Sequence, residues 1–147
     1  MTVVDFDRGV LGVESAAIGY EVEKGAIRKF AEAIGDEDPI YVDEKAAQAA
    51  GFKTIVAPPT FLCTFRPQEL PDLKMDFGRV RLNGGNAYDY YQPIYAGDTI
   101  TVTAKYADVT ERTGRTGKMV FVITELTFTN QHGEVVAKGR NTGIRRE

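Results

Sequence analysis

Residues 99–106 read Thr-Ile-Thr-Val-Thr-Ala-Lys-Tyr, and this stretch decides the fold. Its apolar and aromatic residues fall on every second position, which is the period of a β-strand with one buried face. Residues 119–123 are apolar on both parities, which is typical of a central strand covered on both faces, and residues 134–144 supply another strand. Turns at residues 113–117 and 131–133 join these strands into an antiparallel meander.

The chain before residue 78 has the spacing of helices instead. A first helix is predicted to begin near Lys24 and to end at Gly35, because glycine readily adopts the left-handed conformation that closes a helix. Its apolar positions recur at helical spacing and comprise Ile27, Phe30, Ala31 and Ile34. Asp43 is the predicted N-cap of a second, alanine-rich helix that closes at Gly51.

A third helix is predicted to open at Pro58 and Pro59, since the first turn of a helix tolerates residues without an N–H. Pro67 should stop this helix after about two turns. Its buried face is expected to comprise Phe61, Leu62 and Phe65. Helices first and a meander after them predict an α+β fold, in which a curved antiparallel sheet surrounds one buried helix.

The composition argues against several classes of protein. The 147 residues, 1–147, are expected to form a single domain. The chain has one cysteine, Cys63, and one histidine, His132, so we expect no intrachain disulfide and no metal site built on several such side chains. Ser15 is the only serine and has no histidine near it in sequence, which argues against a Ser-His-acid hydrolase.

The charge and hydropathy of the chain argue against nucleic acids and membranes as binding partners. The net charge of -3 and the isoelectric point near 5.3 argue against nucleic-acid binding. No apolar run approaches the ~20 residues that a membrane-spanning helix needs. Asp5 and Asp7 are unlike the basic start of a signal peptide, so we expect a cytoplasmic protein with no membrane association.

The stretch most informative about function is residues 35–43, Gly-Asp-Glu-Asp-Pro-Ile-Tyr-Val-Asp. Together with Phe30-Ala31 before it and residues 55–58, Ile-Val-Ala-Pro, after it, this stretch resembles the signature F-A-x-x-x-G-D-x-N-P-x-H-x-D and I-A-x-G of the MaoC-like dehydratases and (R)-specific enoyl-thioester hydratases. Residues 88–98 resemble that family's strand ending in P-(I/L)-x-x-G-D. The resemblance covers about residues 18–146. It is strongest to N-terminal halves of two-domain MaoC proteins and to non-catalytic subunits of heterodimeric 3-hydroxyacyl-ACP dehydratases.

This resemblance implies a hot-dog fold, in which a sheet wraps a central helix and pairs into dimers, and it implies no cofactor. Active members of the family add water to, or remove it from, the 2,3-bond of an acyl thioester of CoA or acyl carrier protein. An Asp and a His hold and activate the water, and a backbone N–H at the start of the central helix holds the thioester oxygen.

Carried over position by position, Asp36 matches the Asp, Tyr41 matches the His and Pro59 matches the glycine of I-A-x-G. Asp36 and Tyr41 are therefore the candidate catalytic residues. The candidate substrate-binding residues are Thr60, Phe61, Phe65, Asn83 and Gly84, although the stretch Asn83-Gly84-Gly85-Asn86 is by itself more typical of a turn than of a ligand contact.

Two of the three matched positions depart from the family pattern. A phenol with a pKa near 10 is a poor general base at neutral pH, and losing such a base costs ~10²–10⁴ in rate. Pro59 has no N–H, and one oxyanion donor is worth ~10²–10³. The N–H of Thr60 or Phe61 could replace it only if the helix started later.

Alternatives remain for several residues. Asp36 either caps its loop or belongs to the site, and Tyr41 either packs as an ordinary core aromatic or takes part in the chemistry. A group of basic side chains has two interpretations: they meet the phosphates of CoA or of a carrier protein, or they are scattered surface charges. These side chains are Lys53, Arg66, Arg112, Arg115 and Lys118.

The function that we predict is an acyl-binding subunit of a 3-hydroxyacyl-thioester dehydratase or enoyl-thioester hydratase, acting on acyl-CoA or acyl-ACP. Its partner, in a heterodimer, supplies the catalytic histidine. One alternative is a self-sufficient homodimeric hydratase that uses Asp36 and Tyr41. Another is a module that binds acyl thioesters without catalysis.

Overall fold

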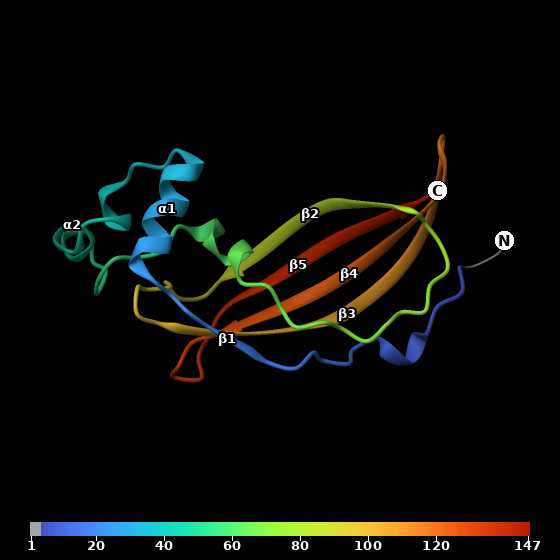
Figure 1. Cartoon of the computed structure of the whole chain (residues 1–147), viewed down its shortest axis with the longest axis horizontal. Helices are drawn as coiled ribbons and strands as arrows, with labels where there is room; N and C mark the ends of the chain where they lie inside the picture. The colour runs from blue at the N-terminus through green and yellow to red at the C-terminus, as the bar shows by residue number, and fades with distance from the viewer. Residues whose placement is uncertain (1–3) are drawn as a thin grey trace.

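The computed structural model describes residues 4–147 and places the helices α1 and α2 at one end of a long curved sheet (Figure 1). The elements in chain order, with η for a 3-10 helix, are η1 (Arg8–Val10), β1 (Ile18–Glu21), α1 (Lys24–Ile34), η2 (Pro39–Tyr41), α2 (Glu44–Ala49), η3 (Pro59–Thr64), β2 (Val80–Tyr90), β3 (Thr99–Gly114), β4 (Gly117–Thr129) and β5 (Val135–Arg146). No helix within residues 4–147 has the length and the apolar character to cross a membrane. The predicted α+β order, helices before a meander, is confirmed.

The five strands form one antiparallel sheet in the order β1-β3-β4-β5-β2. The ladder of β3 shifts between Tyr106 and Asp108, and that of β2 shifts between Asn83 and Gly85. Such bulges bend a strand and increase its local twist, which accounts for part of the curl of the sheet. Strand β2 lies at an edge of the sheet and pairs only with β5 among the described strands.

The strand predicted over residues 119–123 is the middle of β4, and its central place in the sheet is confirmed. The expectation that both of its faces are covered is wrong for this single chain. Val120 and Val122 are buried on the concave side, but the alternate residues, including Phe121, are only half-buried. On that convex side, the guanidinium of Arg112 covers the Phe121 ring at 5.6 Å from its centroid.

The first two helices are confirmed close to their predicted limits. Helix α1 ends at Gly35, whose φ of 72° is left-handed and whose N–H donates to the carbonyls of Ala31 and Glu32. Ile27 and Ala31 are buried, whereas Ile34 at the end of the predicted face is 48% exposed. The carboxylate of Asp43 caps α2 by accepting a hydrogen bond from the Lys45 N–H.

The third helix is present as the 3-10 helix η3, and Phe61, Leu62 and Phe65 at this segment are buried as predicted. Prolines set its length and type. Pro58 and Pro59 have no N–H, and Pro67 disfavours helical backbone at the residue before it, so too few residues remain for a regular α-helix. Residues 65–78 then run without helix along the concave side of the sheet (Figure 1).

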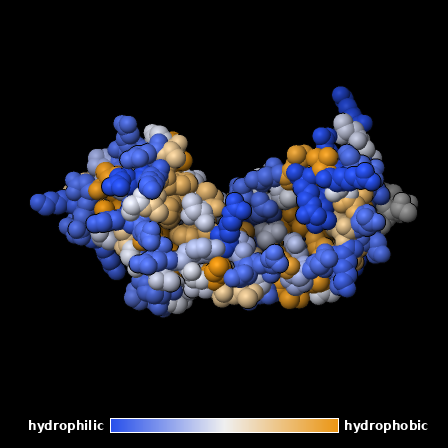
Figure 2. Space-filling model, in the orientation of Figure 1, coloured by the Kyte–Doolittle hydropathy of each residue, from blue (hydrophilic) through white to orange (hydrophobic). Residues whose placement is uncertain are grey.

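Two groups of buried apolar side chains lie on the concave side of the sheet. The first, beneath α1 and η3, includes Ile27, Phe61 and Phe128. The second, at the other end, comprises Phe6, Val10, Leu73, Val120 and Val122. We call them the helix-end core and the strand-end core. Figure 2 shows that the surface is hollowed between the two ends.

Candidate functional site

The loop that follows α1 is held by its own acidic side chains. A carboxylate oxygen of Asp36 accepts a hydrogen bond from the Asp38 N–H at 3.2 Å, and Asp38 accepts one from the Ile40 N–H at 3.2 Å. The Asp36 N–H donates to the Ala31 carbonyl at 3.0 Å, which ties the loop to the end of the helix. Asp36 therefore caps the loop, while its exposed carboxylate keeps a second oxygen for another partner.

Tyr41 lies at the end of η2, and it is 7% exposed and packed in the helix-end core. Burial raises the pKa of its phenol above the usual 10.0, and the negative charges of Asp36 and Asp38 and a hydrogen bond to Asp36 raise this pKa further. The structure thus brings Asp36 and Tyr41 together as the sequence suggested. At neutral pH Tyr41 is a neutral phenol, so it cannot act there as a general base.

The start of η3 lacks the oxyanion donor that the family pattern places at this position. Pro59 is the first residue of η3, and its carbonyl accepts a hydrogen bond from the Tyr90 hydroxyl at 2.9 Å. The Phe61 N–H already donates to the Pro58 carbonyl at 2.9 Å. Thr60 is exposed. The helix start is not shifted, and Phe61 does not offer a free amide in place of the missing one.

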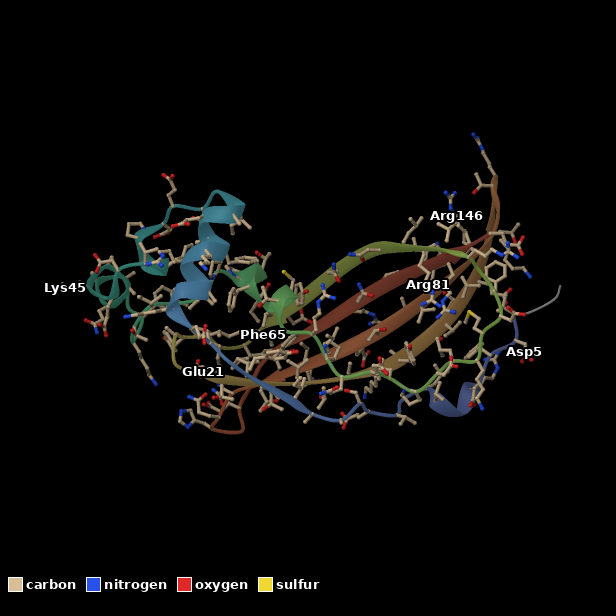
Figure 3. The ribbon with its side chains drawn as sticks, viewed as in Figure 1. Asp5, Glu21, Lys45, Phe65, Arg81 and Arg146 are labelled. Atoms are coloured by element: carbon tan, nitrogen blue, oxygen red, sulfur yellow. The ribbon has the colours of Figure 1, made fainter. Side chains whose placement is uncertain are left out.

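An apolar cavity of about 360 Å³ opens beside Tyr41, between the 35–43 loop and the end of β2. Its walls include Tyr41, Phe52, Pro59, Tyr90, Tyr91 and Ile94. Phe61 and Phe65, both predicted to contact substrate, pack beneath it in the helix-end core, with ring centroids 5.3 Å apart at right angles. Figure 3 shows Phe65 near the end of β2, on the same side of the sheet as α1.

Asn83 and Gly84 lie elsewhere, at the bulge of β2. The Asn83 side-chain oxygen accepts hydrogen bonds from the Gly85 N–H at 3.1 Å and the Asn141 amide at 3.2 Å. A Cβ at Gly84 would lie 2.8 Å from Ile144 Cδ1. Seven residues of strand, about 23 Å, separate Asn83 from Tyr90. The structure therefore does not bring these two residues together with Tyr41.

Several cavity residues were not found from the sequence. Phe52 and Ile94 are ordinary core residues by pattern, and their segments meet at the isolated bridge between Val56 and Tyr95 and through the hydrogen bond from the Ala57 N–H to the Ile94 carbonyl. The sequence also gave no signal for a second, polar cavity at the other end of the sheet, which Arg79, Arg81 and Arg145 line. Within residues 4–147, no group of three or more His, Cys, Asp or Glu side chains is arranged to hold a metal ion.

A family model described as the FAS1-like, dehydratase domain region matches residues 9–139. The chain belongs to this family. A UPF0336 protein from Parafrankia sp. is 36% identical to this chain. The match covers 83% of the chain and 82% of that protein. A probable enoyl-CoA hydratase alpha subunit from Thermomonospora curvata is 30% identical over 78% of the chain, which spans only 41% of that protein.

Solved structures agree with this family. The ChsH1–ChsH2 complex from Mycobacterium tuberculosis superposes with a TM-score of 0.79 at 22% identity, over 92% of this chain and 89% of that one. The HadBC (3R)-hydroxyacyl-ACP dehydratase complex from the same organism gives 0.71 at 26% identity, over 92% and 96%. A MaoC-like dehydratase from Rhodospirillum rubrum gives 0.66 at 23%, over 100% and 94%. These structures confirm the hot-dog fold and the resemblance to MaoC-like dehydratases. The chain is a member of a hydratase and dehydratase family.

Proposed function

We propose that this chain is the acyl-binding subunit of a 3-hydroxyacyl-thioester dehydratase or enoyl-thioester hydratase, and that a partner subunit supplies the catalytic histidine. The observation that carries this proposal is the buried Tyr41 phenol next to Asp36, with a pKa raised by burial and by the carboxylates. A group held neutral in this way takes no proton from water at neutral pH. Together with Pro59, which has no N–H, it leaves the loop without a base and position 59 without the amide donor of the family pattern.

The apolar cavity supports acyl binding. Its volume of about 360 Å³ falls in the usual range of small-molecule sites, and aromatic rings and prolines form most of its wall. The hydroxyl of Tyr90 is held by the Pro59 carbonyl, which fixes the ring at the mouth of the cavity. An acyl chain is a suitable occupant, because burying its methylenes gains about 0.8 kcal/mol each while such walls offer little to a polar ligand.

The edge strand β2 supports pairing with a partner. Its outer edge has no strand beside it in this chain, and its exposed apolar residues include Val80 at 37%, Leu82 at 46% and Tyr90 at 47%. An uncovered strand of 11 residues is a template for strand pairing with another chain. The relatives' own names, two complexes and an alpha subunit, agree with a protein that works in pairs.

In such a pair, the two subunits divide the work. The partner's histidine moves the proton, and this chain contributes surfaces that bind the thioester and exclude water from it. Tyr41, neutral and packed in the helix-end core, serves as a fixed wall of the cavity. No cofactor is required for either direction of the reaction.

Hydration assays of a short enoyl-CoA test the proposal. The purified chain alone should show no hydration activity. Co-expression with a subunit that contains G-D-x-N-P-x-H-x-D should give a stable complex with a turnover of ~10 s⁻¹, typical of enzymes. The matched control is the same complex with that histidine changed to glutamine. Comparable turnover by the chain alone would overturn the proposal in favour of a homodimeric hydratase that uses Asp36 and Tyr41. A lack of any complex and any activity would favour a binding module.

Asp36→Asn in the active complex separates the two roles of Asp36. If the carboxylate only closes its turn, the amide oxygen still accepts from the Asp38 N–H, and kcat stays unchanged. A fall in kcat of about 10²-fold or more would place Asp36 in the chemistry of the pair.

A further inference from the structure

Three arginines line one cavity at the end of the sheet opposite to α1 and α2. The cavity has a volume of about 660 Å³, and Arg79, Arg81 and Arg145 lie on its wall with the segment from Met75 to Gly78. Figure 3 shows Arg81 at this end of the sheet, near Arg146 and far from Lys45 on α2. The basic side chains considered from the sequence did not include these three arginines.

Strand register brings two of the arginines together. Arg81 of β2 lies directly opposite Arg145 of β5, and Arg145 lies opposite Val120 of β4, which is fully buried on the concave side. Residues that face each other across neighbouring strands project to the same side of a sheet. Both guanidinium groups therefore leave the sheet on its concave side, although like charges in that arrangement destabilise a strand pair.

The backbone beside them is built closely around Arg145. Gly78 has a φ of 82°, and a Cβ there would lie 2.6 Å from the Arg145 Cβ and 3.1 Å from the Arg146 N. Only glycine permits this approach without a shift of the strand. The close backbone holds the Arg145 stem, so the guanidinium is presented from a fixed base.

Within residues 4–147, none of the three arginines forms an ion pair with a carboxylate. An ion pair instead joins Lys118 and Glu111. Asp76 and Glu147 line the same cavity, so three positive and two negative side chains leave it with one net positive charge. Burial and the Arg81 charge lower the pKa of Arg145, and Tyr106 and Asp72 raise it. An anion placed between the guanidinium groups would remove their repulsion.

We infer that Arg79, Arg81 and Arg145 form a binding site for the phosphate groups of the thioester substrate, whether they belong to CoA or to the phosphopantetheine of a carrier protein. The planar guanidinium matches a phosphate with two parallel hydrogen bonds, and paired arginines are typical of phosphate sites. This inference rests on the proposed function, because the acyl thioester is what brings the phosphate.

The position of the site indicates which acyl cavity it serves. Arg81 and Tyr90 are nine residues apart on β2, about 30 Å along the strand, so the arginines lie at the wrong end for the cavity of their own chain. If two β2 edges meet about a two-fold axis, they run antiparallel, and the Arg81 end of one meets the Tyr90 end of the other. The arginines of this chain then lie beside the acyl cavity of the catalytic partner.

The first test uses the chain alone, titrated with inorganic diphosphate and with free CoA by calorimetry. Arg81→Gln with Arg145→Gln should weaken both ligands by about tenfold or more, the value of a lost charge-assisted hydrogen bond. The matched control is Arg28→Gln with Lys45→Gln, which makes the same change of charge on exposed side chains of α1 and α2, at the opposite end of the sheet, and should alter affinity less than about twofold. The exposed Arg79→Gln is the variant to use should the double variant fail to fold.

Equal losses in the arginine-site variant and its control would mean that only diffuse charge attracts the anion, and would overturn the inference. So would the absence of saturable binding of either probe by the native chain.

The second test uses the active complex and separates this inference from the proposed function. Arg81→Gln with Arg145→Gln should raise KM for an enoyl-CoA by about tenfold with kcat unchanged, because the phosphate contacts are equally made in ground and transition states. The corresponding pantetheine thioester, which has no phosphate, should not distinguish the variant from the native complex. A larger rise in KM with enoyl-CoA than with enoyl carrier protein identifies CoA as the source of the phosphate, and the reverse identifies the carrier.

The outcomes diverge when only one of the two ideas is wrong. An active complex whose KM for enoyl-CoA is unaffected by the double variant would overturn the phosphate site and leave the proposed function intact. A chain that binds diphosphate through these arginines but forms no active complex would do the opposite.

Discussion

The helix end of the sheet and its strand end share the same five strands, but they are covered differently. At the helix end, α1 and η3 seal a large core of aromatic and aliphatic side chains, and the cavity that remains is lined by tyrosines and prolines. At the strand end, η1 and residues 65–78 cover a smaller core, and the cavity beside it is lined by arginines. A single curled sheet thus offers an apolar site and a cationic site about one strand length apart.

In the function that we propose, the chain keeps the family's fold and leaves the proton transfer to a partner. The family motif survives at the helix end, where Asp36 and Tyr41 still meet. Its reactive groups are replaced by a neutral phenol and by Pro59, which has no N–H. We propose that the chain retains the capacity to bind at both ends, through an apolar cavity at one and a charged cavity at the other.

The largest expected effects come from emptying each core in turn. Phe128→Ala removes a fully buried ring from the helix-end core and should cost about 3–5 kcal/mol, whereas Leu73→Ala in the strand-end core should cost about 2–5 kcal/mol. Urea unfolding followed by circular dichroism and by tyrosine fluorescence measures both. If residues 1–147 form one domain, as we propose, each variant shifts one shared transition to lower urea.

The control for these variants is Val13→Ala, which changes a 44% exposed side chain and should alter stability by less than about 0.5 kcal/mol. Two separate transitions, with Leu73→Ala moving only one of them, would show that the two ends unfold independently and would contradict the single domain.

The second prediction concerns whether the helix end can regain catalysis. Tyr41→His restores the imidazole, but the chain alone should then hydrate enoyl-CoA only weakly, because Pro59 still offers no amide. Adding Pro59→Gly should increase the rate by about 10²–10³, the value of one oxyanion donor. Steady-state hydration assays measure this, with Pro59→Gly alone as the inactive control. A double variant no faster than Tyr41→His would mean that the N–H at this position does not point at the substrate.

The sequence predicted the helix end better than the strand end, for a physical reason. Gly35, Asp43 and the proline pair at residues 58–59 act locally, so the limits of α1, α2 and η3 followed from neighbouring residues alone. The encounter of Arg81 with Arg145 depends on the pairing of β2 with β5, 64 positions apart in sequence and shifted by a bulge. Strand parity fixes which face a side chain takes only once that register is known.

The lack of information on which strands are neighbours also explains why both faces of β4 were expected to be buried and why Phe52 was not predicted to line the cavity. An apolar run such as residues 119–123 is compatible with burial on both faces, and only the structure shows that its convex face is half-buried in a single chain. Asn83 and Gly84 were candidates for a substrate contact or a turn, and the bulge that they form could not be predicted without knowing which strand lies beside β2.

A smaller effect should distinguish two glycines with the same backbone conformation. Gly12 and Gly78 have φ values of 80° and 82°, but a Cβ at Gly12 meets nothing within 4 Å, whereas one at Gly78 meets Arg145. Gly12→Ala should therefore cost about 1–2 kcal/mol for the left-handed conformation alone. Gly78→Ala should cost more than Gly12→Ala in urea unfolding and should also weaken diphosphate binding. Equal costs with unchanged binding would show that Arg145 moves aside freely.

The smallest expected effect is in the alkaline titration of Tyr41, and it tests whether Asp36 acts on that residue. The pKa of Tyr41 is raised in the folded chain, so between the unfolded and folded pKa values the folded state binds more protons than the unfolded state. The contribution of Tyr41 to stability is therefore fully present below about pH 10 and is lost as pH rises through the folded pKa, by at most about 1.4 kcal/mol per pH unit.

Two variants isolate that contribution in urea unfolding above pH 10. Tyr41→Phe should flatten the fall in stability with pH, because a phenyl ring has no proton to lose. Asp36→Asn should bring the tyrosinate absorbance of Tyr41 closer to the ordinary range, since it removes one of the charges that raise the pKa, while Asp43→Asn, which caps α2 and is not among those charges, should leave it unchanged. If Asp36→Asn and Asp43→Asn shift the titration equally, Asp36 is a loop cap with no specific hold on Tyr41, and the pair that identifies the family motif would not be a functional pair in this chain.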